Sequence, residues 1–476
     1  MKFTLNEELK VKVYFVEKDD ELKMLDDNVR DYAKNVHKFN GENRTTFADI
    51  GPTSSNIVLI GIGENPNSNA IRQGGYNAGK VLNDNKVEEA EVFIKEREGI
   101  AENTVLMCTT EGFEQQDYVF DQYKTKKNEN TLKKISYNTS FDDEEGQGYL
   151  DYAAHILGGV NLTRELVNTP SIDMYPEVLA QRAKEALEPY GIEVEIFDRA
   201  QIEAMGMEAF LAVAEGSDKE PRFIVMKYLP EGEDKSAIGL VGKGITYDSG
   251  GYALKPARSM STMKIDMSGV ATIVGVLQAL AKNKVNRNVI GVGALCENMI
   301  SGKSYKNGDI IGSMKGTTIE VNNTDAEGRV ILADALYYTA TEQNVDSIID
   351  IATLTGACTV ALGDYTTGAL SNNPELMAKV SQGAGYSGEF IHEFQANDFL
   401  REQVKGKFGD LVNSTFKPGG AITAGIFLEH FVEGKPWVHL DIAPTAWADS
   451  QWGYLPVGAT GIPVKSLHNF IKAEER

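Results

Sequence analysis

The chain reads VGKGITYDSGGYALKPARSMSTMKIDMSG from residue 241 to residue 269, a glycine-rich segment that begins with apolar residues and carries Asp248 and Asp266 before a helical pattern begins. Val270, Ile273 and Leu277 recur at helical spacing directly after it, so the segment predicts a strand, a turn and a buried helix. Similar apolar runs flank this segment, namely RFIVMKY (222–228), AIGLVG (237–242), NVIGVGAL (288–295), SIIDIATL (347–354) and WVHLDIA (437–443). Strands that are apolar on both faces are typical of a sheet covered by helices on both sides. We therefore predict an α/β fold with a central mixed sheet flanked by helices.

The first third of the chain indicates a second, smaller α/β domain. Short β-type runs such as NIVLIGIG (56–63) and EVFIK (91–95) alternate there with polar helical stretches. An acidic stretch, FDDEEGQG (141–148), then precedes a helical pattern. A chain of 476 residues also exceeds the usual size of one domain. We predict an N-terminal α/β domain over 1–145, a connecting helix and linker over 146–175, and a larger C-terminal α/β domain over 176–476.

The composition excludes several classes of protein. Acidic residues outnumber basic ones, 69 against 47, and the net charge of -22 repels phosphate backbones, so nucleic acid is not an expected partner. The three cysteines, Cys108, Cys296 and Cys358, are too few and too scattered for a disulfide framework or a cysteine zinc site. The N-terminus lacks the apolar stretch of a signal peptide, and no run of about 18 apolar residues occurs. We expect no membrane association and a cytoplasmic location.

Carboxylates concentrate in two glycine-rich, apolar segments, 241–269 and VNNTDAEGRVILADAL (321–336). A buried carboxylate must be paired or must bind a metal, so these acids need positive charge nearby. Two divalent cations would balance the four of them, Asp248, Asp266, Asp325 and Glu327. Oxygen-rich ligation without Cys or His favours manganese, with magnesium and zinc as alternatives.

Each of these acids, taken alone, is equally consistent with an exposed turn. Their position makes the metal hypothesis stronger, because Asp266 directly precedes the helical pattern and Asp325 follows a predicted strand, TIEV (318–321). Junctions between strands and helices meet at one edge of an open α/β sheet, where such folds build their sites. We therefore expect the two segments to converge there.

Three basic side chains accompany the acids. A lysine binds a metal only when it is neutral, a state that burial and adjacent cations favour by lowering its pKa, and we assign this role to Lys243. Lys255 is expected to stay protonated and to stabilise negative charge on a reacting carbonyl group. Arg329 stands at the start of a predicted helix, a position that suits the binding of an anion.

VGKGITYDSGG, the lysine of LKP, MKIDMSG and above all NTDAEGR closely resemble the leucyl aminopeptidase family, also called the cytosol aminopeptidase family. Stretches such as RELVNTPS (164–171) and WVHLDIAPTAW (437–447) extend the resemblance to the end of the chain, whereas the N-terminal third carries little of it. The resemblance implies a leucyl aminopeptidase, a metallo-exopeptidase that releases N-terminal amino acids, preferentially leucine or other apolar residues, from peptides. A water that bridges two metal ions would attack the peptide bond.

The resemblance also implies a role for each residue of the site. Asp248 and Glu327 would bridge the two metals, Asp325 would complete one metal site, and Lys243 and Asp266 would complete the other. Lys255 and Arg329 would be catalytic, and Arg329 would hold a bicarbonate ion that acts as general base.

Further implications concern the substrate pocket and the assembly. Met263, Thr353 and Gly356 are expected to shape the pocket for the first side chain, and the family forms homohexamers. Pro444 occupies a position near this pocket where the family usually has glycine, so the preference for leucine is only a default.

Two other functions are compatible with the same residues. One is a non-catalytic assembly or regulatory role on the same scaffold, which the intact set of ligands disfavours. The other is a different binuclear hydrolase, acting on phosphoesters or acyl amides.

Overall fold

In the computed structural model, which describes residues 1–127 and 129–475, the chain divides into two units. Unit 1 comprises Met1–Leu157 and Ser450–Val457, and unit 2 comprises Gly158–Asp449 and the segment from Gly458 to the C-terminus. Helix α4, Asp143–Asn168, runs through the division and along most of the predicted connecting segment. The residue boundaries that we derived from the sequence stay predictions.

Unit 1 contains a six-stranded sheet in the order β1-β6-β5-β2-β4-β3, which is parallel except for β3. Its strands are β1 (Lys2–Leu5), β2 (Lys12–Glu17), β3 (Thr46–Asp49), β4 (Ile57–Gly63), β5 (Glu89–Phe93) and β6 (Lys134–Asn138). Its helices besides α4 are α1 (Asp27–Asp31), the π-helix η1 (Tyr32–Val36), α2 (Ser68–Asp84) and α3 (Glu102–Asp117). Apolar side chains of α2 and α3 pack with those of the sheet in one core.

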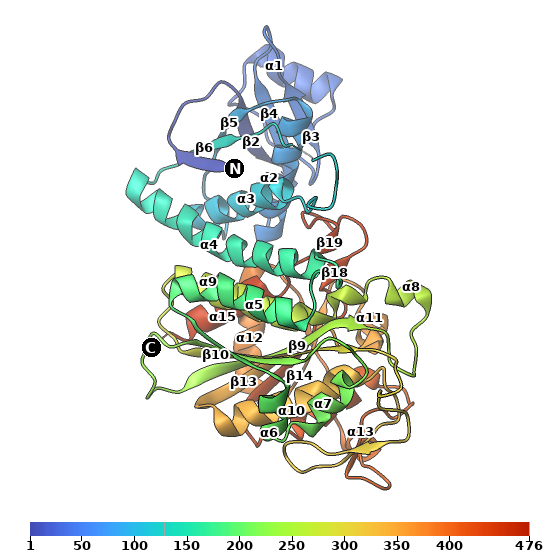
Figure 1. The fold of residues 1–476 in the computed structure, drawn as a ribbon. Helices are drawn as coiled ribbons and strands as arrows, with labels where there is room; N and C mark the ends of the chain where they lie inside the picture. Colours follow the sequence, from blue (N-terminus) through green and yellow to red (C-terminus); the bar gives the residue numbers. More distant parts are fainter. Residues whose placement is uncertain (128, 476) are drawn as a thin grey trace. The chain divides into compact units, whose positions relative to one another are not determined.

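Unit 2 contains an eight-stranded mixed sheet in the order β15-β14-β17-β13-β9-β10-β8-β7 (Figure 1). The central strands β10, β9, β13 and β17 are parallel to one another, and β7, β8 and β14 are each antiparallel to a neighbour. The strands are β7 (Glu193–Phe197), β8 (Arg222–Tyr228), β9 (Ala237–Asp248), β10 (Val289–Asn298), β13 (Val345–Ala352), β14 (Thr367–Ser371), β15 (Ile391–Glu393) and β17 (Trp437–Asp441). The α/β fold with two domains and a mixed sheet flanked by helices, predicted from the sequence, is confirmed.

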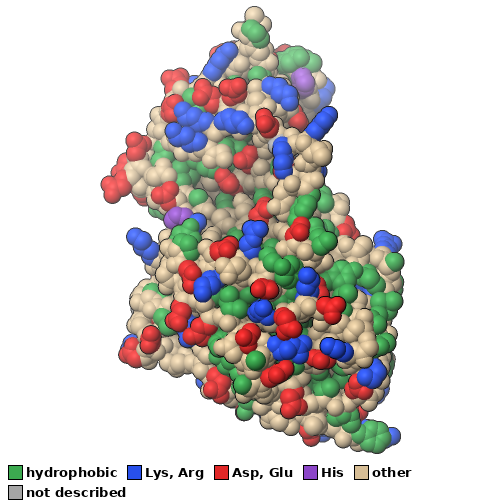
Figure 2. Space-filling view, in the orientation of Figure 1, with side chains coloured by type: hydrophobic (Ala, Val, Ile, Leu, Met, Phe, Trp, Pro, Cys, Tyr) green, Lys and Arg blue, Asp and Glu red, His purple; other side chains and the backbone are tan. Residues whose placement is uncertain are grey.

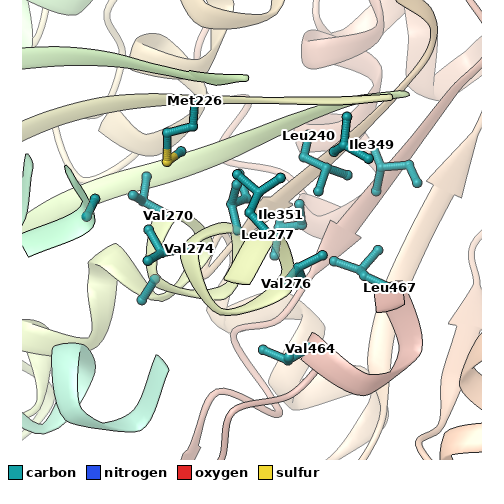
Figure 3. Close-up of a cluster of buried hydrophobic side chains, with 14 of the residues drawn as sticks. Met226, Leu240, Val270, Val274, Val276, Leu277, Ile349, Ile351, Val464 and Leu467 are labelled. Atoms are coloured by element: carbon teal, nitrogen blue, oxygen red, sulfur yellow. The ribbon is translucent and has the colours of Figure 1, made fainter. Parts of the chain in front are cut away.

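Helices cover both faces of this sheet. One face packs against α5 (Pro176–Leu187), α9 (Ser268–Lys282), α12 (Pro374–Ser387) and α15 (Val464–Ala473). The other face packs against α6 (Arg199–Ala204), α7 (Glu208–Ala214), α10 (Glu327–Glu342) and α14 (Gly420–Glu429). Successive residues of β9, Leu240 and Val241, point into the two different cores, as strand geometry requires. Figure 3 shows part of the first core, in which Leu240 of β9 lies beside Ile349 of β13, and Val270 and Val274 of α9 lie beside each other.

Shorter elements complete unit 2. A three-stranded sheet joins β11 (Ile310–Ile311), β12 (Ile319–Glu320) and β16 (Leu411–Val412), and a two-stranded sheet joins β18 (Trp447–Ala448) and β19 (Gly458–Ala459). The remaining helices are η2 (Glu188–Tyr190), α8 (Ala257–Met260), η3 (Met263–Met267), α11 (Gly356–Leu362) and α13 (Asp398–Gln403). The sequence suggested that TIEV is a strand of the central sheet, and this was wrong. Only its two middle residues form a strand, and they pair in the small sheet.

Among the described residues, one long and apolar helical segment is Met263–Lys282, which consists of η3 and α9. By length and composition it is able to cross a membrane, but 83% of its most apolar window is buried inside the structure. Its apolar character is explained by its place in the core against β9 and β13.

On the face of each unit that Figure 2 shows, charged side chains of both signs are interspersed. Arg199 illustrates the pattern, because its guanidinium lies 2.9 Å from Glu215 and 3.2 Å from Glu220. Exposed pairs of this kind contribute little to stability. They do show that part of the acidic excess is neutralised locally.

Candidate metal centre

The predicted metal ligands meet at the carboxyl end of the central strands of unit 2. Lys243 lies within β9 and Asp248 ends it, Asp266 lies in η3, and Glu327 is the first residue of α10. Asp325 lies in the turn before α10. Asp248, Asp325 and Glu327 each offer a carboxylate oxygen, and these three oxygens lie within 4.8 Å of one another. The structure thus brings together acids that are up to 79 positions apart in the sequence, from 248 to 327.

A close approach of η3 and α9 to the sheet makes this convergence possible. A Cβ atom at Gly269 would collide with the carbonyl oxygen of Ile351 and would lie 2.7 Å from the backbone nitrogen of Lys243. Only glycine allows the start of α9 to come this close to β9 and β13. The contact places Asp266 beside Lys243.

Two lysines connect the four acids. The Nζ atom of Lys243 lies 2.8 Å from Asp266 Oδ1 and 2.9 Å from Glu327 Oε1. The Nζ atom of Lys255 lies 2.8 Å from Asp248 Oδ2 and 2.6 Å from Asp325 Oδ1. Four carboxylates and two ammonium groups leave this cluster with a formal charge of -2 (4 negative, 2 positive).

The pKa values reflect this imbalance. Burial raises the pKa of Asp248, and the adjacent carboxylate of Glu327 raises it further. Burial also raises the pKa of Asp266 well above its usual range, although Lys243 opposes the shift. Burial alone would lower the pKa of Lys243, but Asp266 and Glu327 more than offset it, so the net shift is upward. Lys243 therefore becomes a neutral ligand only where added cations neutralise the carboxylates around it.

The residues fit divalent cations. Asp266 Oδ2 and Glu327 Oε2 are buried, and neither accepts a hydrogen bond from any residue that the structure describes. A buried acceptor without a partner costs about 1–3 kcal/mol, and more when it is charged. Cations beside these two oxygens would satisfy them and would remove the excess negative charge.

Several neutral groups hold the acids in place. Asp248 Oδ1 accepts hydrogen bonds from Asn298 Nδ2 and from the backbone nitrogen of Gly250, each at 2.8 Å. The Thr353 hydroxyl donates to Asp266 Oδ1 at 2.7 Å. Asn298 was not predicted from the sequence, where it follows Glu297 at the carboxyl end of a mainly apolar strand.

Arg329 lies in the first turn of α10, where its Nη1 donates to the carbonyl oxygen of Asn413 at 2.8 Å. Burial lowers its pKa to about 10, so the group stays cationic at neutral pH. Its Nε is buried and has no hydrogen-bond partner among the described residues. Such a cation fits a small anion.

Asn413, which was not predicted from the sequence, also holds the turn before Asp325. Its side chain accepts a hydrogen bond from Asn322 N at 2.9 Å and donates one to the Asn323 carbonyl at 2.7 Å.

The three predicted pocket residues lie around the same strand ends. Met263 begins η3, Thr353 directly follows β13, and Gly356 begins α11. Thr353 is buried, and its hydroxyl donates a hydrogen bond to Asp266. A Cβ atom at Gly356 would have no other heavy atom within 4 Å, so the space beside it is open.

Known proteins share both the sequence pattern and the fold. The catalytic-domain model of the cytosol aminopeptidase family matches residues 161–468, and the N-terminal-domain model of that family matches residues 31–127. A probable cytosol aminopeptidase of Clostridium tetani is 44% identical over 476 residues, with 99% of each chain covered. A probable cytosol aminopeptidase of Treponema denticola is 41% identical over 448 residues, covering 93% of this chain and 94% of the relative.

Solved structures agree with these relatives. A variant of tomato leucine aminopeptidase superposes with a TM-score of 0.91 at 31% identity, covering 99% of this chain and 96% of the other. The bottromycin maturation enzyme BotP in complex with Mn superposes with a TM-score of 0.88 at 26% identity, covering 98% and 100%. The resemblance seen in NTDAEGR and the neighbouring motifs is thus confirmed, and the matches extend it to the N-terminal third, so this chain belongs to the cytosol aminopeptidase family of peptidases.

Proposed function

We propose that this protein is a metal-dependent leucyl aminopeptidase that releases N-terminal residues, preferentially leucine or other apolar ones, from peptides in the cytoplasm. The observation that carries the proposal is the cluster of buried acids, in which two carboxylate oxygens have no partner among the described residues. Buried charges in such an arrangement need cations.

The site would hold two divalent cations. Asp248 and Glu327 would bridge them, Asp325 would complete one metal site, and Lys243 and Asp266 would complete the other. Manganese is our first choice, with zinc and magnesium as alternatives, and the manganese complex of BotP supports that order. When bound, such cations act as Lewis acids that polarise a carbonyl group and make water a stronger nucleophile.

Lys255 would donate a hydrogen bond to the oxygen of the scissile carbonyl as negative charge develops there. Burial alone would lower the pKa of Lys255, but the nearby Asp248, Glu327 and Asp325 raise it. The group is therefore protonated at neutral pH, which is the state that a donor requires. Its contacts with Asp248 and Asp325 orient the ammonium group towards the cluster.

Arg329 would hold a bicarbonate ion, which would supply a general base for the attacking water. The support is the buried, cationic guanidinium with an Nε that has no described partner. The bond from Nη1 to the Asn413 carbonyl fixes the plane of the guanidinium, so that the remaining N–H groups have a defined direction.

The first side chain of the substrate would lie near Met263, Thr353 and Gly356, where the open space beside Gly356 leaves room for it. A polar pocket would disfavour an apolar side chain, whereas methionine and glycine offer no polar side-chain group. This supports a preference for apolar residues. A neutral α-amine is also a good ligand for the cations that the acids fit, so we expect turnover only when the N-terminus is free.

One substrate panel tests the proposal against its rivals. Metal-free protein supplied with manganese should hydrolyse leucine amide and should not act on N-acetylated leucine amide or on a phosphoester. Activity on none of the three would favour a non-catalytic role. Efficient cleavage of the blocked amide or of the phosphoester would instead indicate another binuclear hydrolase.

We also propose that the protein assembles as a homohexamer. Sedimentation equilibrium at several protein concentrations would give the mass directly, and a monomer of 52.1 kDa at all concentrations would exclude the assembly.

A further inference from the structure

Thr353 contacts two candidate ligands of the same metal site. Its hydroxyl donates to Asp266 Oδ1 at 2.7 Å, and its carbonyl oxygen accepts from Lys243 Nζ at 3.0 Å. The residue directly follows β13 and is only 7% exposed. The hydroxyl and the carbonyl of Thr353 are thus both used within the acidic cluster.

The two carboxylate oxygens of Asp266 differ in their hydrogen-bond partners. Oδ1 receives the Thr353 hydroxyl and also lies 2.8 Å from the Lys243 ammonium. Oδ2 is buried and accepts from no described residue. Two donors on one oxygen fix the rotation of a carboxylate about its terminal bond, so the other oxygen is the one that is offered to a cation.

We propose that Thr353 is a positioning residue, which orients Asp266 through its hydroxyl and Lys243 through its carbonyl so that both can bind one metal ion. This inference rests on the two-metal site of the proposed function and adds a role for a residue that the family resemblance assigns to the substrate pocket. Only the methyl group of Thr353 then remains to contact a substrate.

Two substitutions separate the two roles of the side chain. Thr353→Val keeps the shape and the methyl group but removes the hydroxyl, whereas Thr353→Ser keeps the hydroxyl and removes the methyl group. If Thr353 is a positioning residue, Thr353→Val should weaken the metal affinity of the protein. If Thr353 only lines the pocket, Thr353→Ser should change the substrate selectivity.

The experiment titrates manganese into metal-free wild-type, Thr353→Val and Thr353→Ser protein by calorimetry. Loss of a hydrogen bond to a metal-binding carboxylate typically weakens metal affinity about 10-fold to 100-fold, so Thr353→Val should lose that much at one of two sites. Thr353→Ser should bind both ions as the wild type does. Because the carbonyl contact with Lys243 is present in every variant, the difference isolates the hydroxyl.

Selectivity is measured on the same proteins as the ratio of kcat/KM for leucine amide to that for alanine amide. This ratio should be unchanged in Thr353→Val. Wild-type affinity at both sites in Thr353→Val would overturn the inference while leaving the proposed function intact, whereas a wild-type protein that binds no manganese would overturn both. If Thr353→Val does not fold, as judged by circular dichroism, Thr353→Ala lacks the same hydroxyl and carries the same prediction.

Discussion

Replacing Gly328 by alanine leaves every candidate ligand chemically intact but requires one of them to move. A Cβ atom at this position, the second residue of α10, would lie 2.5 Å from Cε, 2.7 Å from Nζ and 2.8 Å from Cδ of Lys243. Ordinary contacts between such atoms are about 3.5–4.0 Å, so the lysine must be displaced by about 1 Å. The displaced ammonium group then loses its present positions beside Asp266 and Glu327.

The expected effect is large on activity and small on stability. A misplacement of about 1 Å in a catalytic site can lower the rate about 100-fold, and we expect a loss of that order in kcat/KM. Overpacking typically costs about 1–3 kcal/mol, but alanine is favoured over glycine within a helix by about 1 kcal/mol. The free energy of unfolding should therefore fall by no more than about 2 kcal/mol.

The assay combines leucine amide hydrolysis, manganese titration and thermal unfolding. Gly385→Ala is the matched control, because Gly385 is an exposed residue of α12 whose added Cβ would have no heavy atom within 4 Å. It should keep wild-type activity and gain slightly in stability. Full activity and wild-type manganese affinity in Gly328→Ala would refute the reasoning, because Lys243 would then not need its present position.

Four further substitutions test other parts of the site and the fold. Arg329→Ala should lower kcat about 100-fold to 10,000-fold with little change in KM or bound metal. In carbonate-depleted buffer, added bicarbonate should raise wild-type activity only, and an equal response of both proteins would contradict the role of Arg329. Asp248→Ala and Glu327→Ala should each lose at least one metal ion while staying folded. Elemental analysis that finds two tightly bound ions in either variant would place the bridging ligand elsewhere. Burial raises the pKa of Asp334 from its usual 3.8 to about 7, although backbone N–H groups of Met314 and Phe210 oppose the shift. The folded state therefore keeps a proton that the unfolded chain has released, and the free energy of unfolding should fall by a few kcal/mol as the pH rises from 3.8 to about 7, then level off. Urea denaturation across this range should show that slope for the wild type but not for Asp334→Asn, and the same slope in both would exclude Asp334 as its source.

The periodicity of the sequence was sufficient for the main elements of unit 2. RFIVMKY coincides with β8, and the helical pattern from Val270 coincides with α9, because a buried element must be apolar wherever it faces a core. TIEV was misplaced, since a short run of apolar residues does not indicate which sheet its backbone will join. Pairing depends on partners far away in the chain, and Ile319 pairs with Leu411.

The clustered acids were easier to single out from the sequence than the neutral groups that hold them. The acids stand out because carboxylates are costly in apolar surroundings, whichever partner they have. Asn298 and Asn413 are common polar residues, and their importance comes only from the hydrogen bonds that the fold creates. Thr353 and Asp266 are 87 positions apart, so no local pattern indicates that the hydroxyl meets the carboxylate.

Because the acidic cluster is buried, the stability of this protein should also depend on the divalent ions that are available to it. Every candidate ligand comes from a segment that reaches its place only when the central sheet has formed, so an unfolded chain offers no comparable site. An ion that binds only the folded state stabilises it by about 1.4 kcal/mol for each tenfold excess over its dissociation constant. Chelators would therefore weaken the fold as well as activity. During purification or heating, the concentration of divalent ions should determine how long the chain stays folded.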